Sequence, residues 1–366
     1  MERLYPQLIL DALQSVRYPG TGKNIVEAEM VADDIRIDGN TVSFSIIFPK
    51  ATDPFARSLM KAAEAAIHRE ISNEVVVTIN AQYPTVVAEK KPALPGVKNI
   101  VGVSSGKGGV GKSTVASNLA VALAREGYKV GLLDADIFGP SVPKMFGLED
   151  ETIYMHEVDG RQLIIPAERY GVKVLSIGFL VDKNAPVLWR GSMASNALRQ
   201  LIEEADWGEL DYFLIDMPPG TSDIHLTLVQ TLAMTGVVVV STPQEVALAD
   251  ARKGIAMFMG EKVNVPVLGL VENMAWFTPE LHPEERYYIF GREGAVRLAQ
   301  QLNIKLLAQI PIVGSICDGG DGGEPIALKD SISGHSFIHL AHEVIDAVDE
   351  RNEMLPPTEK VDVKRK

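Results

Sequence analysis

The sequence predicts an α/β protein in which a doubly wound, mostly parallel sheet follows a small α+β domain. From residue 98 onward, apolar runs that suit strands alternate with helical stretches, which is typical of a parallel sheet covered on both faces. The chain has 366 residues, more than one domain usually needs, and 46% of them are hydrophobic. Residues 86–97 carry charges and two prolines without periodicity, so they read as a linker between two domains.

The first domain is expected to span residues 1–85. Helical periodicity predicts helices at 2–16 and 55–71. Strand-like runs occupy 32–37, 41–48 and 74–79, and the turn residues Asp38, Gly39 and Asn40 join the first two. Asp53 and Pro54 before the second helix form a plain N-cap arrangement, and we expect this domain to be a recognition module.

The second domain is expected to span residues 98–354. Continuous or β-branched apolar runs predict its strands at 100–104, 129–133, 172–177, 212–215, 237–241, 265–271 and 304–310. The tail 355–366 is polar and contains prolines, and we expect it to be disordered.

Composition excludes several classes of protein. The net charge of −13 argues against nucleic acid as the main partner and against docking on an anionic bilayer. Cys317 is the one cysteine, so no intrachain disulfide can form, and a reducing compartment is expected. The N-terminus lacks the pattern of a signal peptide, and no apolar run reaches the ~18–20 residues of a membrane span. We therefore expect a cytoplasmic protein without a membrane partner.

A glycine-rich segment between a predicted strand and a predicted helix carries the main functional signal. Gly106, Gly111, Lys112 and Ser113 satisfy G-x-x-x-x-G-K-[ST] in the context that this P-loop motif requires. Glycines let backbone N–H groups surround phosphates, and the helix N-terminus adds positive potential. We expect ATP to bind here, with Lys112 at the β- and γ-phosphates and Ser113 as a ligand of Mg²⁺. The residues predicted to contact the nucleotide are Gly106, Lys107, Gly108, Gly109, Val110, Gly111, Lys112, Ser113 and Thr114.

Carboxylates follow two further strands. Asp216 ends the run 212–216, where a P-loop protein places the acid that holds Mg²⁺ or its waters. Asp134 and Asp136 come directly after the run 129–133. A helix N-cap after a strand is the alternative reading of these acids.

The letters KGGVGKST at 107–114 resemble the deviant P-loop of the ParA, MinD and nitrogenase-reductase class. The resemblance implies that Lys107 crosses a homodimer interface to the nucleotide of the partner, and that Asp136 orients the attacking water. It also implies that Asn273 and Pro311 contact the adenine. The plain alternatives are a solvated loop lysine, a turn asparagine and an ordinary loop proline.

Nearly the whole chain resembles the Mrp/ApbC-type ATPases, the iron–sulfur cluster carriers of this class. The resemblance includes the small N-terminal domain and the approach LPGVK at 94–98. It also includes DADIFGPS at 134–141, LWRG at 188–191, DMPPGTSD at 216–223 and ENM at 272–274. It implies slow ATP hydrolysis, a homodimer, and delivery of a cluster to apoproteins as clients.

The sequence departs from that family in its thiols. Typical members have a Cys-x-x-Cys pair shortly after ENM, and this chain has none there. A cluster generally needs about four thiolates, whereas a homodimer of this chain offers only the two copies of Cys317, in a run 317–323 that we expect to be flexible. His282 with Glu280, Glu284 and Glu285 could replace the missing ligands, or could be a charged surface loop. Likewise, His335, His339 and His342 share one predicted helix face, which suits either a metal or solvent.

Three functions therefore stay open from sequence. The first is an ATP-gated iron–sulfur cluster carrier, and the second is a nucleotide-gated chaperone or scaffold without a cluster of its own. The third is a spatial organiser like ParA or MinD. The acidic balance disfavours DNA binding, and the tail 355–366 lacks the apolar stripe of a membrane-binding helix.

Overall fold

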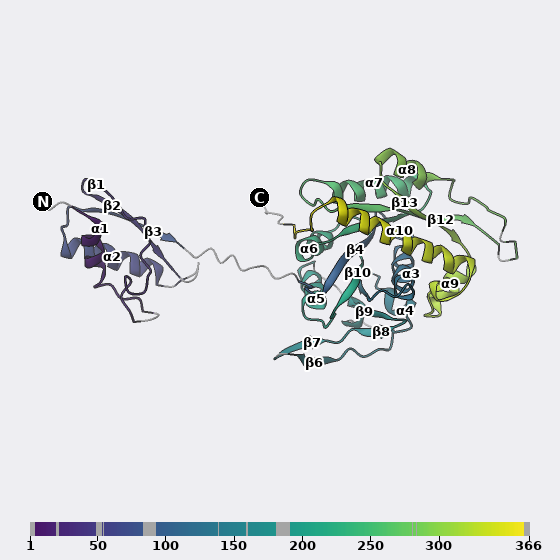
Figure 1. The fold of residues 1–366 in the computed structure, drawn as a ribbon, viewed down its shortest axis with the longest axis horizontal. Coiled ribbons are helices and arrows are strands. Elements are labelled where there is room, and N and C mark those ends of the chain that lie inside the picture. Colours follow the sequence, from purple (N-terminus) through teal and green to yellow (C-terminus); the bar gives the residue numbers. More distant parts are fainter. Residues whose placement is uncertain are drawn as a thin grey trace. The chain divides into compact units, whose positions relative to one another are not determined.

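The computed structural model divides the chain into two compact units, residues 1–90 and 91–366 (Figure 1). It describes residues 4–19, 22–48, 53, 55–82, 93–137, 139–158, 160–180, 191–279, 281–282 and 284–361. Most of the expected linker and the segment 188–190 of the LWRG motif lie outside the described residues.

In its described residues, the N-terminal unit is a three-stranded sheet with two helices. Its elements are α1 Pro6–Leu13, β1 Arg36–Asp38, β2 Thr41–Ile47, α2 Ala56–Glu70 and β3 Val76–Gln82. β1 pairs antiparallel with β2, and β3 pairs parallel with β2, because α2 carries the chain back across the sheet. Large apolar side chains such as Phe44 and Ile67 are fully buried in its core. The first strand is shorter than the expected run 32–37, of which residues 32–35 precede it.

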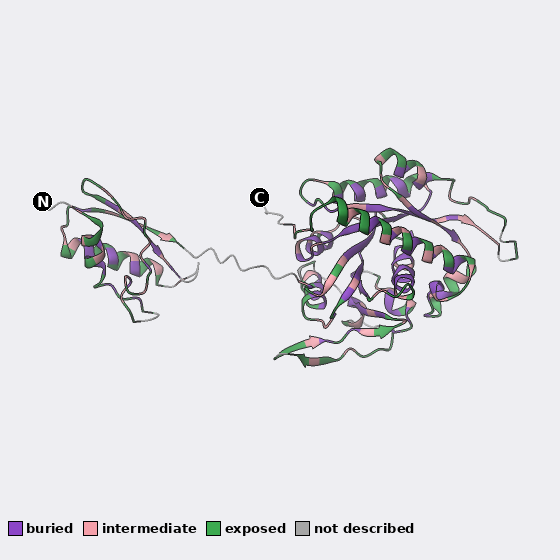
Figure 2. Cartoon of the chain, in the orientation of Figure 1, coloured by how far each residue is buried: buried purple, intermediate pink, exposed green. Residues whose placement is uncertain are grey.

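The larger unit contains the predicted parallel sheet. Its strand order is β13-β12-β11-β4-β10-β5-β9-β8, and every pair is parallel except β8 with β9. The strands are β4 Val97–Ser105, β5 Val130–Asp134, β8 Ala167–Arg169, β9 Val172–Ser176, β10 Leu210–Asp216, β11 Gly236–Ser241, β12 Val267–Phe277 and β13 Leu306–Ile312. Figure 2 shows the strands of this sheet, apart from the edge strand β8, as largely buried, which explains why they read as continuous apolar runs.

Helices cover both faces of this sheet. One face packs against α3 Lys112–Arg125 and α10 Ile332–Met354, and the other packs against α5 Gly191–Glu203, α6 Asp223–Thr231, α7 Glu245–Met259 and α8 Gly294–Leu302 (Figure 1). Shorter helices are α4 Val142–Met145 and α9 Gly314–Asp321, with 3₁₀ turns η1 Ile177–Leu180 and η2 Ile326–Leu328. None of the helices in the described part of the chain combines the length and the apolar content that a bilayer crossing requires.

Three features differ from the sequence expectations. A hairpin of β6 Met155–Val158 and β7 Arg161–Ile164, together with the edge strand β8, was not predicted, because these short strands are largely exposed and carry no continuous apolar run. Cys317 lies on α9 and not in a flexible run, since α9 packs against α4 and η2 and this packing overrides the weak helix propensity of glycine. The start of the expected tail contacts the domain, because Thr358 Oγ1 donates to Ala233 O at 3.2 Å and residue 361 donates its N–H to Val229 O at 3.2 Å.

Candidate functional site

The candidate site lies where the carboxyl ends of β4, β5 and β10 meet at one edge of the parallel sheet. Between β4 and α3 the chain turns through residues 106–111, with Gly109 and Gly111 in the left-handed region at φ 80° and 82°. Only glycine adopts this region without strain, so the loop can expose its backbone N–H groups. The first N–H groups of α3 also have no partner within the helix, which suits an anion.

Two glycines of this loop are required by close packing. A Cβ atom at Gly106 would lie 2.1 Å from the backbone carbon of Asp250 in α7, and one at Gly111 would lie 2.1 Å from Asn273 Nδ2. Both distances are far shorter than van der Waals contact. The loop is therefore held between α7 and the end of β12.

The loop borders a cavity of ≈ 220 Å³. Its lining residues are Ser105, Lys107, Gly108, Gly109, Gly111, Lys112, Ser113, Thr114, Asp136, Ser141, Met145 and Pro219. The structure thus brings together most of the predicted P-loop residues and one predicted acid. Val110 is buried instead, and its carbonyl accepts a hydrogen bond from Asn273 Nδ2 at 2.8 Å.

Lys112 is the electrostatic centre of the site. Its side chain is 6% exposed, and its Nζ lies 2.6 Å from Asp216 Oδ1, 3.5 Å from Asp136 Oδ2 and 3.3 Å from Ser113 Oγ. A buried ammonium group is stable only with such partners. One cation therefore holds two carboxylates and the predicted metal-binding hydroxyl around the same point.

Asp216 has unused capacity to bind a ligand. Its side chain is fully buried, and its Oδ2 has no hydrogen-bond partner among the described residues. Burial raises the pKa of this carboxyl, and the attraction of Lys112 opposes that rise. An orphaned buried carboxylate oxygen next to Ser113 is the kind of donor set that Mg²⁺ or its bound waters would satisfy. The residues present therefore fit a magnesium ion.

Asp134 is fully buried and does not line the cavity. Burial, and secondarily the charge of Asp216, raise its pKa to about 8. Its oxygens accept hydrogen bonds from the backbone N–H groups of Asp136 and Val142 and from the Ser176 hydroxyl. Asp134 thus contacts the loop that carries Asp136 and the end of β9.

Neither Asn273 nor Pro311 lines this cavity. Both are buried, and the Asn273 amide nitrogen is engaged with the P-loop at Val110. Their contact with adenine stays a prediction. Sequence reasoning missed Ser105, Ser141, Met145 and Pro219; Ser141 and Pro219 could have been found, since they stand inside the segments DADIFGPS and DMPPGTSD.

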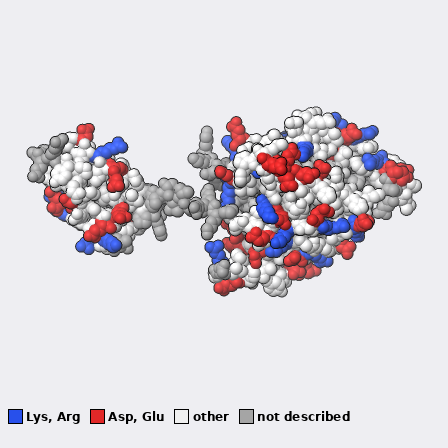
Figure 3. Space-filling model, in the orientation of Figure 1, with Lys and Arg blue, Asp and Glu red and all other residues white. Residues whose placement is uncertain are grey.

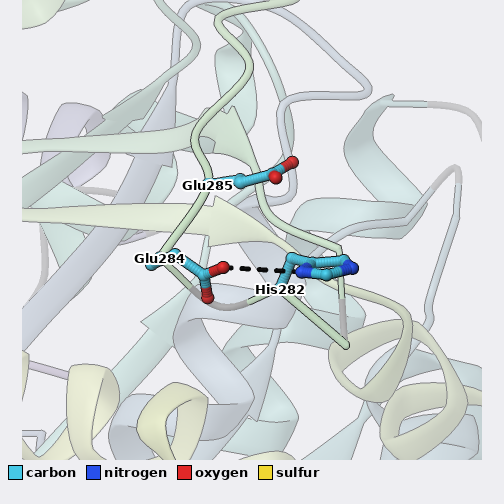
Figure 4. Close-up of side chains that lie close together, drawn as sticks. All are labelled: His282, Glu284 and Glu285. Carbon is cyan, nitrogen blue, oxygen red and sulfur yellow. Dashed lines mark ion pairs between the residues drawn. The ribbon is translucent and has the colours of Figure 1, made fainter.

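The loop between β12 and α8 holds the other candidate ligands. His282 Nδ1 lies 3.4 Å from Glu284 Oε1, and Glu285 lies close to this pair (Figure 4). All three side chains are exposed, and the Tyr287 hydroxyl donates to Glu285 Oε2 at 2.6 Å. Glu280 lies outside the described residues. The ion pair and the exposure are what a charged surface loop also gives.

Cys317 and the three candidate histidines of α10 are at the surface. Cys317 is exposed, and the charge of Asp321 raises its pKa, which disfavours the thiolate that binds iron. His335 pairs with Asp330 at 2.7 Å, and His342 pairs with Glu126 at 2.9 Å. These two histidines thus engage separate acids and do not converge on one point.

Comparison with known families assigns both units. Residues 96–346 match the model described as NUBPL iron-transfer P-loop NTPase, within the ParA group. Residues 6–81 match the model described as iron-sulfur cluster assembly protein.

Individual relatives agree with these matches. The chain is 40% identical over 344 residues to an iron-sulfur cluster carrier protein of Synechocystis, covering 93% of this chain and 97% of that protein. It is 45% identical over 261 residues to the mouse iron-sulfur cluster transfer protein NUBPL, covering 70% and 79%. A solved nucleotide-binding protein of Archaeoglobus fulgidus, in complex with ADP and with cobalt, is 42% identical, with a TM-score of 0.55, covering 63% of this chain and 88% of that one.

Proposed function

Because the chain belongs to the family of iron-transfer P-loop NTPases, we propose that it is an ATP-hydrolysing carrier of iron–sulfur clusters that delivers them to apoproteins. The observation that carries the nucleotide half of this proposal is the buried Lys112 between Asp216 and Asp136, with one Asp216 oxygen left over beside Ser113. The relative solved with ADP supports the same assignment.

The roles of the residues follow from their positions. Loop 106–111 and the first N–H groups of α3 surround the phosphates, and Lys112 neutralises them. Ser113 and Asp216 would hold Mg²⁺, whose positive charge would stabilise the negative charge on the phosphate oxygens during hydrolysis. Asp136 lines the same cavity and orients water for attack. In this arrangement, the fixed positions and charges of these residues supply most of the catalysis of hydrolysis.

We propose that the active form is a homodimer. Lys107 is exposed and lines the cavity. In this arrangement the lysine of each subunit reaches the nucleotide of its partner, so that ATP closes the pair and hydrolysis reopens it.

The cargo needs ligands from outside the chain. A four-thiolate cluster does not fit a sequence with one cysteine, because two subunits supply two thiols. We propose that thiols of the client or small thiols supply these ligands and that Cys317 takes no part. The same observation favours the second candidate, a nucleotide-gated scaffold that never holds a cluster itself.

We further propose a cytoplasmic protein whose partners are other proteins and not nucleic acid or membrane. Acidic and basic side chains are interspersed over the face shown in Figure 3, and the net charge is −13. Such a surface offers little general attraction to a polyanion.

The test is anaerobic reconstitution with iron and sulfide, followed by transfer to an apo-acceptor whose activity requires a cluster. ATP is added or withheld, and phosphate release is followed in parallel. The proposal requires MgATP hydrolysis by the purified chain and ATP-dependent activation of the acceptor. If the chain hydrolyses ATP but binds no iron and does not activate the acceptor, the nucleotide-gated scaffold is the supported function.

A further inference from the structure

Ser176 makes a buried contact that the proposed function does not explain. It ends β9 beside Asp134, which ends β5, and both side chains are fully buried. The Ser176 hydroxyl donates to Asp134 Oδ2 at 2.9 Å and accepts the N–H of Gly178 at 2.9 Å. Since a hydroxyl has a single hydrogen, these two partners fix its direction. Neither Ser176 nor Asp134 lines the phosphate cavity.

The Asp134 carboxyl group binds both ends of the loop 135–141. Its Oδ1 accepts the N–H of Asp136 at 3.1 Å, and its Oδ2 accepts the N–H of Val142 at 3.3 Å. Val142 is the first residue of α4, so the second contact also satisfies a free N–H group at a helix start. One side chain therefore fixes where the loop begins and where it ends.

Near its C-terminal end the loop also packs against the turn that follows β9. A Cβ atom at Gly178 would lie 3.0 Å from Pro140 Cβ and 3.1 Å from Ser176 Oγ, so the turn after β9 packs tightly against the loop. The loop in turn brings Asp136 and Ser141 to the wall of the cavity. The position of Asp136 at the cavity wall thus depends on contacts that run through Asp134 to Ser176.

We propose that Ser176, acting through the Asp134 carboxyl group, is a positioning residue for ATP hydrolysis, because it fixes the loop that carries Asp136. This inference rests on the proposed ATPase activity. The residues expected to hold the nucleotide, Lys112 and Ser113, come from α3, and the shorter carboxylate contact of Lys112, 2.6 Å, is with Asp216 outside this loop. Loss of the Ser176 hydroxyl should therefore lower kcat and leave nucleotide affinity unchanged.

The experiment compares three variants of the full-length protein. Ser176→Ala removes the donor, and Ser176→Thr restores it. Ser45→Ala is the matched control, because the buried Ser45 hydroxyl donates to Asp34 Oδ2 at 2.6 Å in the N-terminal unit. For each variant, kcat comes from phosphate release, affinity from titration with a fluorescent ATP analogue, and folding from thermal unfolding.

We expect Ser176→Ala to lower kcat about 10-fold, since small displacements of a catalytic group can cost up to about 100-fold. Its affinity for the analogue should stay within about twofold of wild type, as expected for an interaction that acts only in the transition state. Ser176→Thr should recover most of the rate, and Ser45→Ala should keep the wild-type kcat.

Two results would overturn the inference: an unchanged kcat in a folded Ser176→Ala protein, or equal losses of rate and affinity that threonine does not reverse. Should Ser176→Ala fail to fold, Gly178→Ala is measured instead, since its added Cβ, 3.0 Å from Pro140 Cβ and 3.1 Å from Ser176 Oγ, strains the same contacts without removing the hydroxyl group. An unchanged kcat in that variant would equally overturn it. Wild-type protein that binds but does not hydrolyse ATP would remove the proposed ATPase itself, which is a distinguishable outcome.

Discussion

Lys112→Ala should destabilise the protein and abolish nucleotide binding, and the two effects can be separated. Lys112 is 6% exposed and Asp216 is fully buried, and their atoms lie 2.6 Å apart. Breaking such a buried pair from one side costs about 3–5 kcal/mol. Since burial raises the pKa of Asp216, this carboxyl can take up a proton when its partner is gone. We therefore expect the free energy of unfolding to fall by about 3 kcal/mol, near the lower end of this range.

A double variant and a surface control make this prediction specific. Lys112→Ala with Asp216→Asn replaces the stranded carboxyl by a neutral amide, and we expect it to recover about 2 kcal/mol of stability but no nucleotide binding. Lys98→Ala breaks a pair of similar length with Asp211, 2.7 Å, but Lys98 is 71% exposed. That change should cost less than about 1 kcal/mol.

The assay is urea unfolding of the four proteins, combined with titration of a fluorescent ATP analogue. Lys112→Ala should weaken binding by more than about 100-fold, because it removes the buried ammonium group that lines the cavity. Equal losses of stability in Lys112→Ala and Lys98→Ala, or a double variant no more stable than Lys112→Ala, would refute the role assigned to the buried ion pair.

The remaining predictions concern the dimer, pH, the loop glycines and the cargo. Lys107→Ala should spare nucleotide binding but slow hydrolysis and weaken ATP-dependent pairing in sedimentation; equal loss of binding in Lys107→Ala and in the P-loop lysine variant would contradict its role across the interface. Burial, aided by the nearby P-loop lysine, lowers the pKa of His225 to about 4. The folded state therefore keeps it neutral, and the stability present above about pH 6.5 is lost towards pH 4, by up to about 3 kcal/mol. In unfolding curves at pH 7 and 4.5, His225→Asn should show a smaller loss than wild type, and an identical loss would refute the assignment. Gly106→Ala should prevent nucleotide binding, whereas Gly109→Ala, with nothing within 4 Å of its added Cβ, should cost only about 1 kcal/mol of backbone strain, as measured by unfolding. Reconstituted wild type and Cys317→Ser should contain equal iron by metal analysis, and a cluster lost only in the variant would assign the thiol to it.

The sequence predicted the sheet and the P-loop well for a physical reason. Parallel strands covered on both faces must be apolar throughout. Continuous apolar runs in the sequence therefore identify β4, β5, β9, β10, β11, β12 and β13. A P-loop is likewise encoded within a few consecutive residues. Both signals are local, and the structure contains both elements.

Contacts between segments that are distant in the sequence could not be predicted from such local patterns. The hydrogen bond from Asn273 to the Val110 carbonyl joins residues 163 positions apart, and no local pattern reports it. In the sequence, Ser176 is an ordinary polar residue at the end of a strand. Only the register of β5 and β9 places it opposite Asp134. The helical state of the glycine-rich segment around Cys317 also comes from packing against α4, against its local propensity.

The most direct test of the account is a crystal structure of the protein with Mg²⁺ and a non-hydrolysable ATP analogue. We expect the triphosphate inside loop 106–111, with Lys112 Nζ moved from Asp216 to the phosphates. The metal should lie between Ser113 Oγ and the Asp216 carboxylate or its bound water. A cavity without nucleotide at saturating analogue, or an Asp216 side chain turned away from the metal, would contradict the assignment.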